Sequence, residues 1–152
     1  MTSLKFDSKQ NRSANNNKVI GIYLDLQKAF DTVNHDILLY KLHNYGIRGV
    51  AYDWFRNYWS GRYQYISVNG VNSELTVVTC WVPQGSALGP LLFLVYINDI
   101  KKAVPGEQIK LFADDTNLFI SGCTIGDVNF SANIKLNQLY DWLTANKLSV
   151  NI

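Results

Sequence analysis

The chain has 152 residues, 47% of them hydrophobic, so it is long enough to bury one core and too short for two domains of ordinary size. Its formal net charge of only +2 does not by itself indicate a nucleic-acid-binding protein, whose basic surface is usually more pronounced. The longest apolar run, residues 91–97, is far below the roughly 20 residues needed to cross a bilayer, so we expect no membrane partner.

The N-terminal residues 1–18 are polar, rich in asparagine and without a hydrophobic signal region. We therefore expect a disordered leader over 1–18, an intracellular protein, and a folded domain over 19–152. The two cysteines, Cys80 and Cys123, are far apart and lack the spacing of metal ligands. This spacing favours reduced, ordinary thiols over a disulfide or a zinc site.

The first predicted element is a strand over residues 19–24, because this segment is rich in β-branched and aromatic residues. Its continuous apolar character predicts a central strand covered on both faces, with Asp25 at its carboxyl end. Asn34 is the expected N-cap of a helix over 35–44, and Gly46 the expected stop. A second helix ends at residues 60–61. Its apolar face, which we expect in the core, consists of Ala51, Trp54, Phe55, Tyr58 and Trp59.

Residues 63–68 and 75–78 predict the two strands of a hairpin around a turn at Asn69-Gly70. A glycine-rich loop follows and leads into an apolar helix that we expect from about Leu88 to Lys102. The helix cannot begin much earlier, because Pro90 is tolerated only in the opening turn.

A turn at Pro105-Gly106 leads into a second predicted hairpin, with Asp114 and Asp115 at its tip. A final helix is expected after Gly122 and Gly126, and the last residues are expected to be extended. These elements predict one α+β domain, in which helices face an antiparallel sheet.

The adjacent carboxylates of Asp114 and Asp115 repel each other, and a divalent cation would relieve that repulsion. The flanking apolar residues should draw this hairpin toward a core; they are Leu111, Phe112, Leu118 and Phe119. Neighbouring strands of one sheet could bring Asp25 to the same place. Such oxygen-only clusters suit Mg²⁺ or Mn²⁺, and the absence of nearby His or Cys argues against zinc. Taken alone, however, the pair favours a solvated β-turn.

Three motifs that follow one another along the chain favour the cation site over the solvated β-turn. They are Asp25-Leu-Gln-Lys-Ala-Phe-Asp31, Val82-Pro-Gln-Gly-Ser-Ala-Leu-Gly-Pro-Leu-Leu-Phe93 with Tyr96-Ile-Asn-Asp99, and Phe112-Ala-Asp-Asp-Thr116. In sequence, order and spacing they closely resemble motifs of non-LTR (LINE-type) retrotransposon reverse transcriptases. The resemblance covers about residues 19–152.

This resemblance implies an RNA-directed DNA polymerase domain with a palm-like antiparallel sheet faced by helices, incomplete fingers and no thumb. It implies two Mg²⁺ or Mn²⁺ ions held by the carboxylates of Asp25, Asp114 and Asp115 and by the backbone carbonyl of Leu26, with Asp25 and Asp114 the more direct ligands. The implied partners are an RNA template, a DNA primer and deoxynucleoside triphosphates. The parent element is expected in the cytoplasm and nucleus.

By the same resemblance, Phe30 matches the aromatic steric gate that rejects a 2′-hydroxyl, and Gln84 and Gly85 match a loop against the incoming nucleotide. Without the matched motif, Phe30 would be taken for a core residue. Trp81 stands where related enzymes usually have Gly, and Phe112 where some have Tyr.

Two alternatives of other classes stay open. A catalytically inactive remnant or interaction module is favoured by Trp81 and by the missing fingers and thumb, whereas the intact carboxylates disfavour it. A standalone nucleic-acid-binding domain is disfavoured by the nearly neutral composition. Because the surfaces that grip the substrates are missing, we do not expect the 152 residues to catalyse polymerisation alone.

Overall fold

The computed structural model describes residues 17–82 and 88–151, so most of the expected leader lies outside the described residues. Helices combine with antiparallel strands, which confirms the predicted α+β class in its general form. The chain forms two compact units, one made of Met1–Ala29 with Ile97–Ile152 and the other of Phe30–Tyr96. No helix in the described part of the chain is long and apolar enough to cross a membrane.

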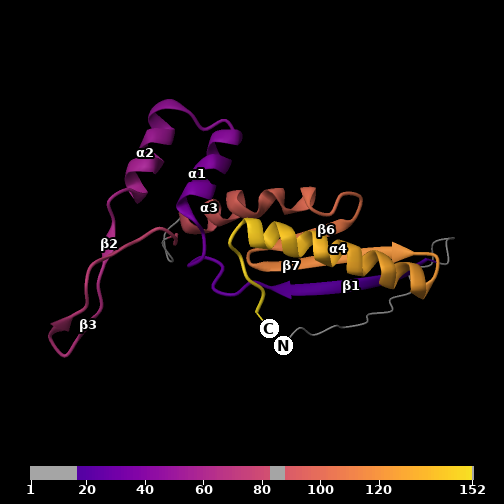
Figure 1. The fold of residues 1–152 in the computed structure, drawn as a ribbon. Coiled ribbons are helices and arrows are strands. Elements are labelled where there is room, and N and C mark those ends of the chain that lie inside the picture. The colour runs from indigo at the N-terminus through magenta and orange to yellow at the C-terminus, as the bar shows by residue number, and fades with distance from the viewer. Residues whose placement is uncertain (1–16, 83–87, 152) are drawn as a thin grey trace. The chain divides into compact units, whose positions relative to one another are not determined.

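The first unit is built on a three-stranded antiparallel sheet in the order β1-β7-β6 (Figure 1). Strand β1 covers Lys18–Asp25, β6 covers Gln108–Phe112 and β7 covers Asp115–Gly122. The predicted second hairpin is confirmed, since β6 and β7 pair directly on either side of residues 113–114. Asp114 therefore lies in a tight turn, and Asp115 is the first residue of β7.

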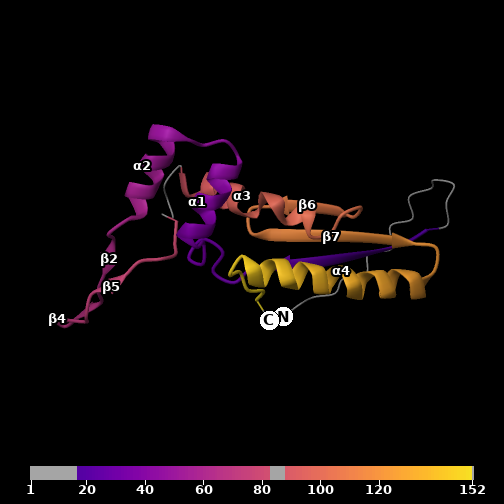
Figure 2. The same cartoon turned by 45° about the horizontal axis from the view of Figure 1, so that its top comes forward.

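One face of this sheet is buried. Three cross-strand pairs of β1 and β7 share it, and all six side chains are buried: Ile20 with Ile120, Ile22 with Leu118, and Leu24 with Thr116. Helix α4, Ile125–Ala145, lies along the sheet (Figure 2) and buries its own apolar stripe. That stripe consists of Val128, Ala132, Leu139 and Leu143.

Helix α4 begins at Ile125, one residue before Gly126, after which the sequence predicted it. Thr124 is the N-cap, and its hydroxyl oxygen accepts a hydrogen bond from the backbone N–H of Asp127 at 3.1 Å. The Asp127 carboxylate accepts in return from the Thr124 N–H at 3.0 Å. This reciprocal capping box fixes the start of the helix and carries Gly126 inside its first turn.

Strand β1 differs from its prediction as a central strand covered on both faces. It pairs with β7 on one side, and along its other side the described chain adds only a bridge between Leu26 and Val150, just past its end. Its burial alternates, with Tyr23 and Asp25 exposed beside buried neighbours. Apolar continuity was the wrong signal here, because exposed Val19 and Tyr23 keep the sequence apolar on the uncovered face.

The second unit contains α1 (His35–Asn44), α2 (Gly49–Trp59) and most of α3 (Leu88–Ile97), which continues as the 3₁₀ helix η1 (Asn98–Lys102). The predicted cap of α1 is confirmed: the Asn34 side-chain oxygen accepts from the Ile37 N–H at 3.2 Å. Capping and turn signals act locally, which is why these boundaries were predictable.

A narrow arm extends from α2 (Figure 1). Its strands are β2 (Tyr63–Gln64), β3 (Ser67–Val68), β4 (Val71–Asn72) and β5 (Thr76–Val77), with β2 paired to β5 and β3 paired to β4. The predicted hairpin is thus confirmed. Asn69 and Gly70 form its turn with φ values of 50° and 81°, the left-handed backbone that Asn-Gly adopts readily.

The aromatic face of α2 is less buried than its helical spacing predicts. Trp59 is buried, but Trp54 is 50% exposed. The rings pack mainly on one another, with Trp54 stacked on Tyr58 at a centroid separation of 5.1 Å and Phe55 stacked on Trp59 at 5.6 Å. Of the face predicted to lie in the core, only Trp59 is buried: Phe55 and Tyr58 are half-buried, and the prediction was wrong for Ala51 and Trp54, which are exposed.

Candidate functional site

The sheet register brings two of the three predicted carboxylates together. Asp25 is the last residue of β1, and its cross-strand partner is Asp115, the first residue of β7. Directly opposed residues of an antiparallel pair have Cβ atoms about 4.5–5.5 Å apart, and their side chains project from the same face. The two carboxylates are therefore neighbours although 90 positions separate them in the sequence.

The carboxylates project from the face of the sheet opposite α4. Side chains alternate along a strand, and the adjacent pair, Leu24 with Thr116, belongs to the buried face that α4 covers. Both Asp25 and Asp115 are exposed, as a site for an external ligand requires. Phe112 pairs with Asp115 and is 78% exposed, so the expectation that this ring draws the hairpin into a core was wrong.

Asp114 lies in the turn, next to Asp115, and is half-buried. The residue before it, Ala113, has a φ of 52°, a left-handed conformation that costs a non-glycine residue free energy. No group of three or more His, Cys, Asp or Glu side chains in the described residues is arranged to hold a metal ion. The roles of Asp25, Asp114 and Asp115 as metal ligands therefore stay predictions. Of the three, Asp25 and Asp115 are cross-strand partners.

Leu26, the predicted carbonyl ligand, has a buried side chain. The backbone carbonyl of Asp25 accepts a hydrogen bond from the N–H of Asn151 at 2.9 Å. Successive carbonyls of an extended chain point to opposite sides, so the Leu26 carbonyl is directed toward the side on which β7 lies. The role of Leu26 as a ligand stays a prediction.

Phe30 belongs to the second unit. Its ring packs on Phe93 of α3 with a centroid separation of 4.9 Å, and its backbone carbonyl accepts from the Val82 N–H at 3.0 Å. The predicted gate is thus tied through its main chain to the segment that leads into the predicted nucleotide loop. Gln84 and Gly85, the loop residues themselves, lie outside the described residues.

The segment before that loop runs antiparallel to the residues around Asn34. The His35 N–H donates to the Thr79 carbonyl at 3.2 Å, and the Trp81 N–H donates to the Val33 carbonyl at 2.8 Å. Trp81 has a φ of 119°. That region of backbone space is essentially reserved for glycine, the residue that related enzymes usually have at this position.

His35 holds the same segment through its ring. Its Nε2 lies 2.8 Å from the Trp81 carbonyl oxygen, which can only accept, so this nitrogen carries a proton. The ring also stacks on Trp59 at a centroid separation of 5.3 Å. Burial lowers the pKa of His35 below its ordinary value of 6.5, and the bond to Trp81 opposes this shift in part.

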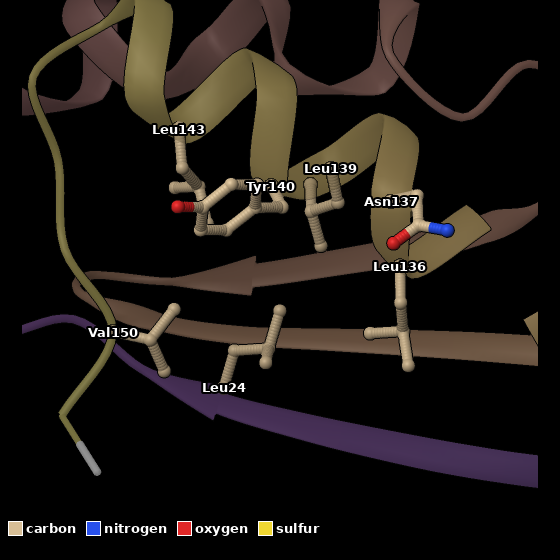
Figure 3. A pocket seen from close by; sticks show the side chains of 7 residues that line it. All are labelled: Leu24, Leu136, Asn137, Leu139, Tyr140, Leu143 and Val150. Carbon is tan, nitrogen blue, oxygen red and sulfur yellow. The ribbon is translucent and has the colours of Figure 1, made fainter. Parts of the chain in front are cut away.

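An apolar cavity of about 270 Å³ lies between α4 and the sheet of the first unit (Figure 3). It is lined by Leu24, Leu136, Asn137, Leu139, Tyr140, Leu143 and Val150. Because Leu24 points to the α4 face, the cavity and the carboxylates lie on opposite faces of the sheet. The cavity is therefore not part of the carboxylate site.

One neighbour of the site was not predicted. The side-chain amide of Asn151 donates to Oδ2 of Asp25 at 3.1 Å. The extended conformation of the last residues was expected, but nothing local to Asn151 indicates a partner 126 positions away.

Comparison with known proteins identifies the family. A model of the family described as reverse transcriptase (RNA-dependent DNA polymerase) matches residues 1–152. The RNA-directed DNA polymerase from mobile element jockey of Drosophila funebris is 29% identical over 136 residues, and that of Drosophila melanogaster 30% identical over 135. The probable RNA-directed DNA polymerase from transposon BS of Drosophila melanogaster is 30% identical over 137 residues.

The matches cover 85%, 84% and 86% of this chain, respectively, but the chain spans only about 15% of the length of each of these curated relatives. Reverse transcriptases generally use divalent metal ions and act on nucleic acid and nucleotides. The match over the whole chain and the origin of its relatives confirm the family predicted from the three motifs: the chain belongs to the reverse transcriptases (RNA-dependent DNA polymerases) of non-LTR retrotransposons.

Proposed function

We propose that the chain is the palm-like part of a polymerase that adds deoxynucleotides to a primer 3′-hydroxyl, directed by an RNA template. The observation that carries this proposal is the register of β1 with β7, in which Asp25 stands opposite Asp115 on an uncovered face of the sheet. Asp114 adjoins this pair in the turn.

The donor groups at this place fit Mg²⁺ or Mn²⁺. Carboxylate oxygens of Asp25, Asp114 and Asp115, with the carbonyl oxygen of Leu26, form the all-oxygen set that these hard cations prefer. When bound, two such ions would activate the attacking hydroxyl and offset the charge of the transferring phosphoryl group. The three carboxylates would hold the ions in the places where that charge develops.

The remaining predicted residues would bind and select the nucleotide. Phe30 would close the space beneath the sugar and so reject a 2′-hydroxyl. The amide of Gln84 and the main chain at Gly85 would lie against the nucleotide and template, where glycine permits a close approach. The proposed partners are an RNA template, a DNA primer and deoxynucleoside triphosphates, and the proposed location of the parent element is the cytoplasm and nucleus.

A chimaera tests this function, since the chain spans about 15% of the jockey polymerase. Residues 19–152 would replace the matching segment of the jockey polymerase of Drosophila melanogaster, so that the rest of the enzyme grips the substrates. We expect Mg²⁺-dependent extension of a DNA primer on an RNA template. Asp25→Asn or Asp115→Asn should each abolish it, because an amide cannot replace a charged ligand.

The matched control is Asp141→Asn, an exposed carboxylate on α4 that we place outside the site. This variant should extend the primer as the parent chimaera does. A chimaera that binds primer and template but makes no Asp25-dependent product contradicts the proposal.

A second candidate, a catalytically inactive module that keeps the fold, is favoured by one observation. The φ of 119° at Trp81 shows that the main chain before the predicted nucleotide loop has kept a glycine-like conformation under a bulky side chain. If the loop no longer served a nucleotide, such a substitution would cost stability alone. Trp81→Gly in the chimaera distinguishes the two, since a gain of activity from none would assign the natural chain to the inactive class.

A further inference from the structure

The end of the described chain adds a short strand beside β1. Leu26 and Val150 form an antiparallel bridge, flanked by two main-chain hydrogen bonds. The N–H of Gln27 donates to the Ser149 carbonyl at 2.8 Å, and the N–H of Asn151 donates to the Asp25 carbonyl at 2.9 Å. In this register Asn151 stands directly opposite Asp25.

Asp25 consequently has a polar neighbour on each side of its strand. Asp115 faces it from β7, and Asn151 faces it from the C-terminal segment. The alternation of side chains along an extended segment explains the arrangement: Val150 lines the apolar cavity beside α4, so the next side chain projects from the carboxylate face. There its Nδ2 donates to Oδ2 of Asp25 at 3.1 Å.

This hydrogen bond acts on the carboxylate in two ways. An ionised carboxylate only accepts, and the amide supplies a donor that offsets part of its repulsion with the opposed Asp115. The bond also restricts rotation of the Asp25 side chain. One oxygen is engaged by the amide, and the other is left for a cation. The main-chain hydrogen bond from Asn151 to Asp25 holds the Asn151 backbone in place. The Asp25 carboxylate is therefore oriented by the Asn151 side chain before any cation binds.

We propose that Asn151 is a positioning residue for the divalent-cation site, which it preorganises by holding one carboxylate oxygen of Asp25. This inference rests on the proposed function, because it assumes that Asp25 binds a cation. Residues that orient a metal ligand in this way typically change metal affinity by about 10- to 100-fold when they are removed.

Mn²⁺ binding to the 152-residue chain tests the proposal without requiring catalysis. Mn²⁺ broadens the amide NMR signals of residues close to it, so a titration gives both the place of binding and the Kd. We expect Asn151→Ala to raise the Mn²⁺ Kd by about tenfold while the main-chain bond to Asp25 persists. The matched control is Asn133→Ala, because the Asn133 amide donates within its own helix, to the Asn129 carbonyl at 3.0 Å.

The same spectra report whether each variant is folded. If Asn151→Ala disturbs the fold, Asn151→Leu, which keeps the side-chain volume and removes the donor, takes its place. A purely structural role would lower the melting temperature and leave the Mn²⁺ Kd of the folded chain unchanged.

Asp25→Asn distinguishes a failure of the positioning role of Asn151 from a failure of the proposed cation site. If that variant loses Mn²⁺ binding but Asn151→Ala and Asn151→Leu bind as the natural chain does, the positioning role is overturned and the cation site stands. If the natural chain shows no Asp25-dependent Mn²⁺ binding, the positioning role and the proposed cation site are both overturned.

Discussion

Trp81, which directly precedes the second motif, has a costly backbone conformation. At a φ of 119°, the Cβ of any L-residue is strained, typically by about 1–3 kcal/mol. The conformation persists because the main chain is held on both sides. Its N–H donates to Val33, its carbonyl accepts from His35, and the next N–H, of Val82, donates to Phe30.

Trp81→Gly should therefore raise the free energy of unfolding by about 1 kcal/mol, since the relieved strain exceeds the entropy that glycine gains in the unfolded chain. Urea denaturation measures it. Trp81→Ala is the matched control, because alanine removes the indole but keeps the strained Cβ, and it should be less stable than the glycine variant. An alanine variant as stable as the glycine variant would contradict the strain.

Phe30 offers a test of sugar selection. In the chimaera, Phe30→Val should raise the ratio of ribonucleotide to deoxynucleotide incorporation by about tenfold or more, because a smaller side chain leaves room for the 2′-hydroxyl. Primer extension with each nucleotide class measures the ratio. Phe30→Tyr keeps the ring that packs on Phe93 and should leave selection unchanged. If the valine variant rejects ribonucleotides as strongly as the parent chimaera does, Phe30 is a packing residue and not a steric gate.

His35 should make stability depend on pH. Burial lowers its folded pKa below the ordinary 6.5, against the smaller raising effects of the Trp81 carbonyl and Asp36, and Arg62 adds to the lowering. Below pH 6.5 the unfolded chain therefore binds the proton more readily. The stability that neutral His35 contributes is complete above this pH and declines as the pH falls toward the folded pKa.

His35→Gln keeps a side-chain donor for the Trp81 carbonyl and does not titrate. Urea denaturation at about pH 7.5 and about pH 5.5 should show a smaller loss of stability for this variant than for the natural chain. Equal losses in the two proteins would assign the pH dependence to other groups.

At the scale of elements, the pairing of β1 with β7 buries one polar atom without a partner. The hydroxyl of Thr116 is fully buried, and no hydrogen-bond partner for it is found in the described part of the chain. Thr116→Val replaces the hydroxyl with a methyl group of nearly the same shape. The free energy of unfolding should rise by about 1 kcal/mol, because the desolvation cost of the hydroxyl is removed.

Thr144→Val on the exposed face of α4 is the control for the same chemical change, and it should alter stability by less than about 0.5 kcal/mol. Equal effects at positions 116 and 144 would show that burial of the hydroxyl is not the cause.

Elements whose ends depend on neighbouring residues were predictable from the sequence. The cap at Asn34 and the turn at Asn69-Gly70 each act within a few positions. Burial was less predictable, because it depends on which elements meet. Trp54 fits a helical apolar stripe, and Phe112 fits an apolar strand, yet both are largely exposed. Apolar spacing indicates a possible buried face and does not say whether anything covers it.

At the scale of the whole molecule, the three motifs predicted the family, but they could not predict how the site is assembled. The opposition of Asp25 and Asp115 required the register of two strands distant in sequence, and the contact of Asn151 with Asp25 required a further bridge. Phe30 falls in a different compact unit from the carboxylates. Motifs are local in sequence, whereas the site is made by pairing between segments about 90 and 126 positions apart.

The two units should also differ in how readily they open. The amides of Leu118 and Ile120 in β7 pair within the buried ladder, so they should be among the slowest to exchange with deuterium. The amides of β3 and β4 belong to exposed strands of two residues each and should exchange much faster. Hydrogen exchange followed by NMR measures the exchange rates of both groups of amides. Similar rates would contradict the expectation that the sheet of the first unit is the more stable part.

The side chains of Val150 and Asn151 point to opposite faces of the sheet, and this constrains the number of residues that can precede them. Losing or gaining one residue just before them would turn valine toward the carboxylates and asparagine into the apolar cavity. Natural variants of this segment should therefore differ by substitution and seldom by a single-residue insertion or deletion. Counting residues between the end of α4 and Asn151 would then locate the partner of Asp25 in relatives whose sequences have otherwise diverged.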